Sequence, residues 1–400
     1  MPYRRLVLIL IVILITLGAF STGYIFGQSE IAPIKLIGPA SITPGAARDS
    51  FRPFWETWQI LNDDFFEQPL NNELLAEGAI DGMLSALEDP NTRYLSPDEE
   101  EAARINLRGS FEGIGAEVTE ENGSITIVAA YEGSPAANAG LKSGDVLRQV
   151  DGVDLTGMDI NEVVRLVRGP AGTAVNLTIE RDGSRFDVNI IRDKIRIPSV
   201  RSELLEEGVA YIRLSRFSDT TTQEFEENLD SLMTSEPTGL ILDLRNNPGG
   251  GLSTAVDIAD HFLGEGLILT ERYGNGEETT FEADEKGLAQ DVPLVVLINE
   301  GSASASEVVA GAIRDRERGV LIGARSFGKG TVQIWRRLSN DGGLRVTVAR
   351  WLTPDGTWVN DEGLTPDITV SMPEPEEGEL IDAQLQRAIE YLLGPATLNQ

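Results

Sequence analysis

Two apolar segments, each followed by a turn of small residues and then a helical pattern, constrain the fold of this chain most strongly. The first runs from Gly239 to Leu244 and precedes a predicted helix at Ser253–Leu263. The second runs from Pro293 to Ile298 and precedes a predicted helix at Ser304–Arg314, with a strand at Val320–Ala324 after it. Strand, tight turn, helix and strand in this order are typical of α/β proteins.

The composition limits the chemistry that such a core can perform. Among 400 residues there is one histidine and no cysteine. A covalent mechanism would therefore need a nucleophile other than a thiol and a base other than imidazole. Acidic residues outnumber basic residues 64 to 33, which gives a net charge of −31 and makes nucleic acid an unfavourable partner. Serine and lysine remain as the candidate pair.

Three serines lie in the turn Gly301–Glu307, between the second apolar strand and its helix. The free N–H groups and the positive dipole end of a helix N-terminus favour developing negative charge, which suits a serine nucleophile. Small neighbouring residues allow a substrate backbone to approach. Spacing alone does not choose among Ser302, Ser304 and Ser306.

Lys329 is the candidate base. It lies between two glycines in the segment Phe327–Gln333 and has no carboxylate as an immediate neighbour. To act near pH 7, its pKa would have to fall by two or three units from about 10.4, which burial can achieve. Gln333, four residues further on, could orient the amine or the serine hydroxyl as a third member of the site.

A phosphate-binding loop is an alternative for the same segment, because Gly323–Gly330 nearly matches GxxxxGK[ST]. Two details disfavour it. Gly330 stands where a magnesium-binding hydroxyl is required, and the residues from Thr331 to Leu338 have a strand pattern rather than the helix that such a loop opens. An antiparallel partner strand is expected at Leu344–Trp351.

The turn Asn246–Gly251 follows the other apolar strand and can present backbone N–H groups to an anion. Together with the amide of Ala305 it could form an oxyanion hole, which is usually the largest electrostatic contribution to acyl transfer.

Residues 107–192 have a different secondary-structure pattern, with short strands of alternating apolar and polar residues, glycine-rich turns and one predicted helix at Ile160–Arg168. The turn Gly113–Ala116, together with Gly133–Ala136 and Gly140–Asp145, resembles PDZ domains. The resemblance implies binding of protein C-termini, with the peptide added as a strand beside the helix. The residues that it implies for the groove are Gly113, Ile114, Gly115, Ala116, Val118, Ile160, Val164 and Val167.

Three stretches resemble the signatures of the carboxyl-terminal processing peptidases, also called tail-specific proteases. They are Leu244–Gly250, Gly301–Glu307 and Phe327–Gln333, in this order. The resemblance covers roughly Trp55 to Asp367 and implies a serine endopeptidase that needs no metal or organic cofactor. It implies Ser304 as nucleophile, Lys329 as general base, Gln333 as orienting residue, and Ala305 with Gly250, or with Gly249 instead, as oxyanion donors.

The same resemblance implies an α/β protease core of repeated β-β-α units, similar to the Clp peptidase and crotonase folds, with an inserted PDZ-like domain. The predicted substrates are proteins or peptides with exposed apolar C-termini. The alternative is a non-catalytic, membrane-tethered PDZ scaffold, which the intact serine, lysine and glutamine disfavour.

The N-terminus indicates export. Arg4 and Arg5 precede an uncharged run from Leu6 to Ser29 that is long enough to span a bilayer. It predicts either an anchor in the cytoplasmic membrane or a cleaved signal peptide, and both place the rest of the chain outside the cytoplasm.

Aromatic residues between Phe51 and Phe65 recur at helical spacing and predict a helix whose apolar face packs in a core or in the subunit interface of a homodimer. The expected organisation is a signal-anchor or signal peptide (1–29), a tether (30–50), an N-terminal helical region (51–106), the PDZ-like domain (107–192), the serine protease core (193–371), and an acidic spacer with a C-terminal helix (372–400).

Overall fold

The structure is a computed structural model that describes residues 47, 49–121, 123–284, 287–372 and 382–394. The chain divides into two compact units, residues 1–74 and 75–400. The predicted membrane segment at 1–29 lies outside the described residues. Within the described ranges, no helix is both long and apolar enough to cross a bilayer.

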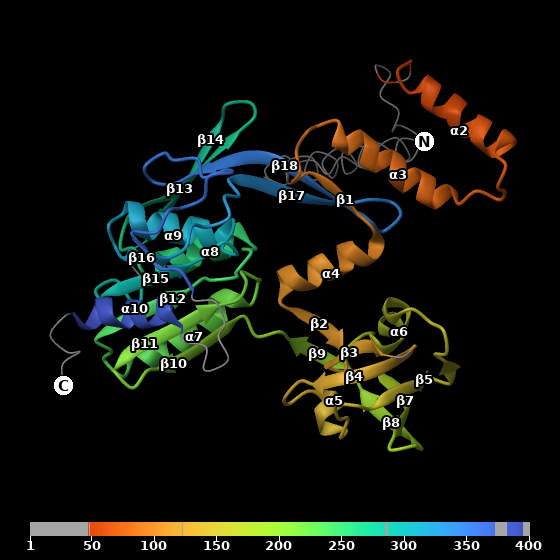
Figure 1. The fold of residues 1–400 in the computed structure, drawn as a ribbon, viewed down its shortest axis with the longest axis horizontal. Coiled ribbons are helices and arrows are strands. Elements are labelled where there is room, and N and C mark those ends of the chain that lie inside the picture. Colours follow the sequence, from red (N-terminus) through yellow and green to blue (C-terminus); the bar gives the residue numbers. More distant parts are fainter. Residues whose placement is uncertain (1–46, 48, 122, 285–286, 373–381, 395–400) are drawn as a thin grey trace, which may run out of the picture. The chain divides into compact units, whose positions relative to one another are not determined.

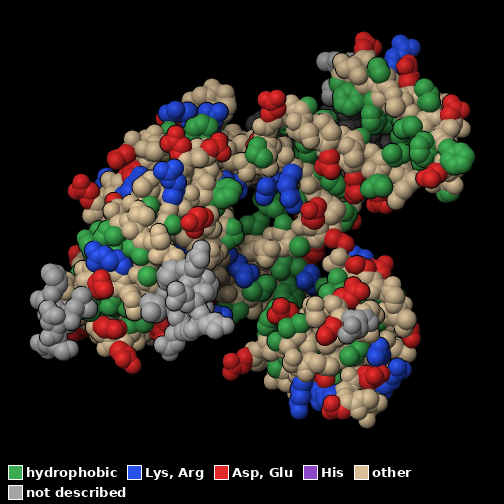
Figure 2. All heavy atoms as spheres, viewed as in Figure 1, with side chains coloured by type: hydrophobic (Ala, Val, Ile, Leu, Met, Phe, Trp, Pro, Cys, Tyr) green, Lys and Arg blue, Asp and Glu red, His purple; other side chains and the backbone are tan. Residues whose placement is uncertain are grey.

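Helix α2 (Arg52–Asp64) dominates the described part of the first unit, and none of its residues is buried. Phe54 and Trp55 stack edge to face with ring centroids 5.0 Å apart, and Trp58 continues the row. Figure 2 shows hydrophobic side chains gathered over this helix. The predicted aromatic face therefore exists, and the other described residues of its unit do not bury it.

A six-stranded sheet in the order β10-β11-β12-β15-β16-β19 forms the centre of the second unit (Figure 1). The edge strand β10 is antiparallel to β11, and the other neighbours are parallel. Its strands are β10 (Val200–Leu204), β11 (Val209–Leu214), β12 (Gly239–Asp243), β15 (Leu294–Ile298), β16 (Val320–Gly323) and β19 (Ile368–Thr369). The helices packed with it are α7 (Thr221–Met233), α8 (Leu252–Asp260), α9 (Ala305–Asp315) and α10 (Ala383–Leu393).

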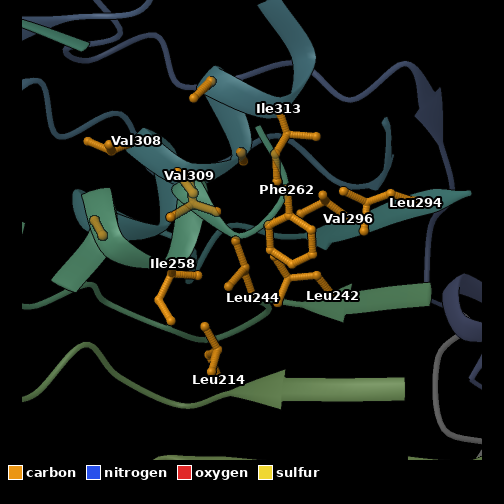
Figure 3. Packing of buried hydrophobic residues seen from close by; sticks show 14 of the residues in the cluster. Leu214, Leu242, Leu244, Ile258, Phe262, Leu294, Val296, Val308, Val309 and Ile313 are labelled. Atoms are coloured by element: carbon orange, nitrogen blue, oxygen red, sulfur yellow. The ribbon is translucent and has the colours of Figure 1, made fainter. Parts of the chain in front are cut away.

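The central strands are buried on both faces, as their continuous apolar sequence predicts. Alternate residues point to opposite sides. Leu242 and Val296 pack with Phe262 and the residues of α8 and α9 in the main core (Figure 3). Ile241 and its neighbours on the other side pack against α10. Because full burial of a leucine or isoleucine side chain contributes about 1.5–3 kcal/mol, these two layers hold the strand ends rigidly.

A second, antiparallel sheet carries the hairpin expected after Lys329. Strands β17 (Thr331–Arg337) and β18 (Gly343–Leu352) pair as predicted, and β18 also pairs with β1 (Arg93–Leu95) and β13 (Gly266–Tyr273). Strand β14 (Glu278–Ala283) completes this sheet. The sequence analysis did not predict the β13–β14 hairpin.

The PDZ-like part has its own five-strand path, β3-β4-β5-β7-β8, and its own apolar core. Its elements are β3 (Ala116–Glu121), β4 (Ser124–Ala130), α5 (Pro135–Asn138), β5 (Val146–Val150), β6 (Val153–Asp154), α6 (Ile160–Val167), β7 (Ala174–Arg181) and β8 (Ser184–Ile191). Strands β2 (Ser110–Gly113) and β9 (Asp193–Arg196) pair where the chain enters and leaves it. Before β2 lie α3 (Asn72–Ser85) and α4 (Pro97–Arg108). Helix α4 begins at the predicted capping box, in which Ser96 is the N-cap.

Candidate active site

The three serines of the Gly301–Glu307 turn have different environments. The Ser302 hydroxyl is fully buried and donates to the Leu244 carbonyl at 2.8 Å. The Ser306 hydroxyl is also buried and donates to the Asn247 carbonyl at 2.8 Å. Ser304 is half-buried at the N-cap of α9. Two of the three hydroxyls are thus bound to the main chain, and Ser304 is the one that solvent reaches.

The backbone at Ser304 is strained, with φ 54° and ψ −113°. A residue with a side chain rarely adopts this conformation, and such strain is commonly found at functional sites. It places Ser304 on a sharp strand-to-helix turn, where the first N–H groups of α9 lie beside it.

The Asn246–Gly251 turn packs directly against this serine. A Cβ atom on Gly249 would lie 2.7 Å from the Ala303 carbonyl oxygen and 3.0 Å from the Ser304 Cβ, so only glycine fits there. The Gly249 N–H donates to the Asn247 side chain at 2.9 Å. The N–H groups of Gly250 and Ala305 donate to no acceptor within the described residues. Between the two predicted alternatives, Gly250 rather than Gly249 has a free amide.

Lys329 lies in the loop before β17 and is half-buried. Its pKa is lowered from 10.5 to about 8, mainly by burial and also by the positive charge of Arg345, although the carboxylates of Glu307 and Asp89 act in the opposite direction. The Lys329 carbonyl accepts the indole N–H of the buried Trp351 at 3.0 Å, which fixes the loop. The sequence analysis required a lowered pKa of this kind for a lysine base.

Glu307 joins the serine turn to the lysine loop. Its Oε2 accepts the backbone N–H of Ser304 at 2.8 Å and that of Lys329 at 2.9 Å. Its Oε1 accepts the Ser326 hydroxyl at 2.6 Å and the Gly328 N–H at 2.7 Å. The carboxylate is fully buried, so all four bonds form away from water. The main-chain nitrogens of Ser304 and Lys329 therefore lie within two hydrogen-bond lengths of each other.

The side chains of the three predicted catalytic residues make no hydrogen bonds to one another in the described part of the chain. In the described part of the chain, no hydrogen bond joins the Ser304 hydroxyl to the Lys329 amine, and Gln333 binds neither. The Gln333 amide donates instead to Thr331 Oγ1 at 2.8 Å and to Thr347 Oγ1 at 3.4 Å. Catalytic hydrogen bonds of free enzymes are often long and shorten when substrate binds.

The PDZ-like part contains a cavity of about 320 Å³ between β3 and α6. Gly113, in β2, and Ile160, at the start of α6, do not line it. Helix α4 adds a wall that was not predicted, through Ala102, Ile105 and Asn106. The predicted groove residues that line the cavity are Ile114, Gly115, Ala116, Val118, Val164 and Val167.

Sequence reasoning missed Glu307 as part of the site. A signal for it was present, because serine followed three residues later by glutamate is the pattern of a capping box. Arg345 and Thr347 were also missed. They lie on the predicted partner strand, but its register, which places Thr347 opposite Gln333, could not be read from a local pattern.

Three known family models match parts of this chain. The model for peptidase family S41 matches residues 208–370, and that for a PDZ domain matches residues 126–181. The model for the N-terminal domain of the activating protease CtpB matches residues 38–99.

Individual relatives are similar over most of their length. The chain is 36% identical over 383 residues to the carboxy-terminal processing protease CtpA of Bacillus subtilis, covering 95% of this chain and 80% of that protein. It is 40% identical over 323 residues to the carboxy-terminal-processing protease of Bartonella bacilliformis, covering 79% and 74%. A solved putative S41 protease from Bacteroides fragilis shares the fold, with a TM-score of 0.50, 16% identity, and coverage of 83% of this chain and 91% of that one. The chain therefore belongs to peptidase family S41, the carboxy-terminal processing serine proteases with a PDZ domain.

Proposed function

We propose that Ser304 is the nucleophile of this protease and that Lys329 is its general base. The observation that carries the proposal is the Glu307 carboxylate, which binds the main chain of both residues and holds a solvent-accessible serine near a lysine with a pKa of about 8. At neutral pH a fraction of such lysines is uncharged and can accept a proton.

In the proposed reaction, the neutral Lys329 amine takes the proton from the Ser304 hydroxyl while Oγ attacks the scissile carbonyl carbon. The free N–H groups of Ala305 and Gly250 stabilise the oxyanion that forms. The Lys329 ammonium then gives its proton to the leaving amine, and the acyl group stays on Ser304. Lys329 next takes a proton from the water that attacks the ester carbonyl, and it returns this proton to Ser304 Oγ as the acyl C–Oγ bond breaks and the product acid leaves. Gln333 orients the amine when substrate is bound.

The PDZ-like part captures the substrate in this proposal. An apolar protein C-terminus enters the cavity between β3 and α6, pairs with β3 as an added strand, and directs its carboxylate to the N–H groups of Ile114 and Gly115. Val164 and Val167 contact the apolar side chains of the tail.

We further propose that the enzyme core consists of repeated β-β-α units, as in the Clp peptidase and crotonase folds.

Localisation and assembly are also part of the proposal. The run from Leu6 to Ser29, with Arg4 and Arg5 before it, supports an extracytoplasmic enzyme that is anchored in the cytoplasmic membrane or released by signal cleavage. The uncovered aromatic face of α2 supports a homodimer through the N-terminal region.

The test combines labelling with turnover. A fluorophosphonate probe for nucleophilic serines should label the wild-type protein but not Ser304→Ala. An unfolded reporter with an apolar tail should be cleaved, and the same reporter with an amidated C-terminus should show a higher KM with kcat retained. Val164→Asp should reproduce this KM effect on the free-acid reporter. Labelling of the Ser304→Ala variant would overturn the assignment of the nucleophile, and equal KM values for the two reporters would overturn the assignment of the groove.

A further inference from the structure

The segment Asp89–Leu95, called the strap below, lies beside strand β18 of the β17–β18 hairpin, although more than 200 residues separate them in sequence. Strand β1 within the strap pairs with β18, with Arg93 opposite Arg345. The Asn91 carbonyl accepts the Arg345 Nε at 3.0 Å. At the far end, the Tyr94 hydroxyl accepts the Asn340 side-chain amide at 2.7 Å. The strap is thus bonded to the turn and to the first half of β18, the strand that pairs with the one carrying Gln333.

Thr92 is the centre of this contact. It is buried, with 7% of its surface exposed. Its hydroxyl donates to the Asp89 carboxylate at 2.7 Å and accepts the backbone N–H of Thr347 at 3.0 Å. The Thr92 hydroxyl thus donates one hydrogen bond and accepts another. Together the two bonds fix the backbone of Thr347 relative to the strap.

Thr347 lies opposite Gln333 in the hairpin, at a β-bulge. The register shifts between Val332 and Gln333, so that Ala349 pairs with Val332 and Thr347 with Gln333. Bulges re-aim side chains and are frequent next to active sites. The Gln333 amide donates to the Thr347 hydroxyl at 3.4 Å as well as to Thr331. One of the two acceptors that direct the Gln333 side chain is therefore a threonine whose backbone N–H the strap holds.

We propose that Thr92, fixed by Asp89, is a positioning residue of the protease, which sets the direction of the Gln333 side chain through Thr347. The proposal rests on the assignment of Gln333 as the orienting residue of the site. The strap connects α3 to the active site, so the segment that follows the N-terminal helices shapes the catalytic residues without touching substrate.

A second contact of the strap supports this role. Arg345, which the Asn91 carbonyl holds, is one of the charges that lower the pKa of Lys329. The carboxylate of Asp89, which accepts the Thr92 hydroxyl, raises the pKa of the same lysine. A displaced strap would therefore change both the orientation of Gln333 and the charge balance around the lysine.

The test is a double-mutant cycle on the full chain with the tailed reporter, using Thr92→Val, Gln333→Ala and the double variant. Thr92→Val keeps the shape of the side chain and removes the hydroxyl, so kcat should fall about 10-fold while KM stays unchanged. Thr92→Ser restores a hydroxyl and should recover kcat to within about 2-fold. If Thr92 acts through Gln333, the double variant should be no slower than Gln333→Ala alone.

The control is Thr178→Val in β7. The Thr178 hydroxyl donates to the Asp187 carboxylate at 2.6 Å, so it makes the same kind of threonine–aspartate hydrogen bond in the PDZ-like part. Because this bond is away from the protease site, the variant should keep the wild-type kcat. Should Thr92→Val fail to fold in a circular dichroism spectrum, Thr347→Val replaces it in the cycle, because it removes one of the two acceptors of the Gln333 amide and retains the N–H that binds Thr92.

Three results would overturn the proposal: an unchanged kcat for Thr92→Val, a serine variant as slow as the valine variant, or a double variant that multiplies the two losses. A fully active Gln333→Ala enzyme would overturn the assignment of Gln333 and with it this inference. Loss of turnover in Ser304→Ala alone, with Thr92→Val at the wild-type rate, would overturn the inference and retain the proposed function.

Discussion

The Glu307 carboxylate accepts the backbone N–H of Lys329 at 2.9 Å through the same oxygen that accepts the N–H of Ser304. A single buried anion therefore aligns the main chain of the proposed base with that of the proposed nucleophile. Hydrogen bonds to an ionised acceptor are about twice as strong as neutral ones. The carboxylate does not bind the Lys329 ammonium directly, which leaves the amine free for proton transfer.

Glu307→Gln should impair both folding and catalysis. Glutamine offers one acceptor oxygen where four donors require two, so its NH₂ group would face N–H donors. We expect the free energy of unfolding to fall by about 1–3 kcal/mol and kcat to fall by about 10²-fold. Urea unfolding and reporter turnover measure these effects. Glu317→Gln, in the exposed turn that follows α9, should change neither. An equally active and stable Glu307→Gln enzyme would refute the role of the carboxylate.

The activity should rise with pH through the pKa of Lys329. The reactive form is the neutral amine, so kcat/KM should reach half of its plateau near pH 8 and level off above it. Because the Arg345 charge lowers this pKa, Arg345→Met should move the midpoint to higher pH. Arg337→Met, an exposed arginine of the same hairpin, is the control. A midpoint that stays in place in Arg345→Met would contradict the electrostatic assignment.

Lys329→Met should be inactive and more stable than the wild type. The folded pKa of about 8 lies below the ordinary value of 10.5, so the unfolded chain binds more protons between these values. Wild-type stability should therefore rise with pH in this window, and the penalty should be fully present below it. Methionine removes the penalty, and we expect a gain of about 1–3 kcal/mol at pH 7 in urea unfolding. A less stable methionine variant would show that the burial cost has been misjudged.

The C-terminal helix should depend on an ionic clamp. Arg245 binds Asp243 in β12 and both carboxylate oxygens of Asp382, at 2.8 and 2.9 Å, before α10. Asp382→Asn should lower the free energy of unfolding by about 1–2 kcal/mol, because it weakens a bidentate pair that is only partly exposed. Glu390→Gln, which breaks an exposed pair with Arg387, should cost less than about 0.5 kcal/mol. Equal effects of the two substitutions would argue against the clamp.

The local parts of the fold were predictable from sequence, whereas the non-local parts were not. The strands β12 and β15 are continuous apolar runs, and α9 begins at small residues after one of them, so local patterns were sufficient. The choice among Ser302, Ser304 and Ser306 needed the structure, because it depends on carbonyls of Leu244 and Asn247, more than 50 residues away.

The β13–β14 hairpin was missed because its strands mix charged, polar and apolar residues without a clear period. The contact between Thr92 and Thr347 joins positions 255 residues apart, and neither belongs to a recognisable motif. Such contacts arise from the packing of complete sheets, which periodicity and local propensity do not encode.

Reporter turnover by Ser304→Ala, Lys329→Ala and the corresponding double variant tests the proposed Ser304 and Lys329 pair most directly. If the two side chains act as one catalytic unit, each alanine variant should lose about 10⁴-fold or more in kcat, and the double variant should be no slower than either one. Turnover near the wild-type rate in Lys329→Ala, or a double variant in which the two losses multiply, would contradict the account.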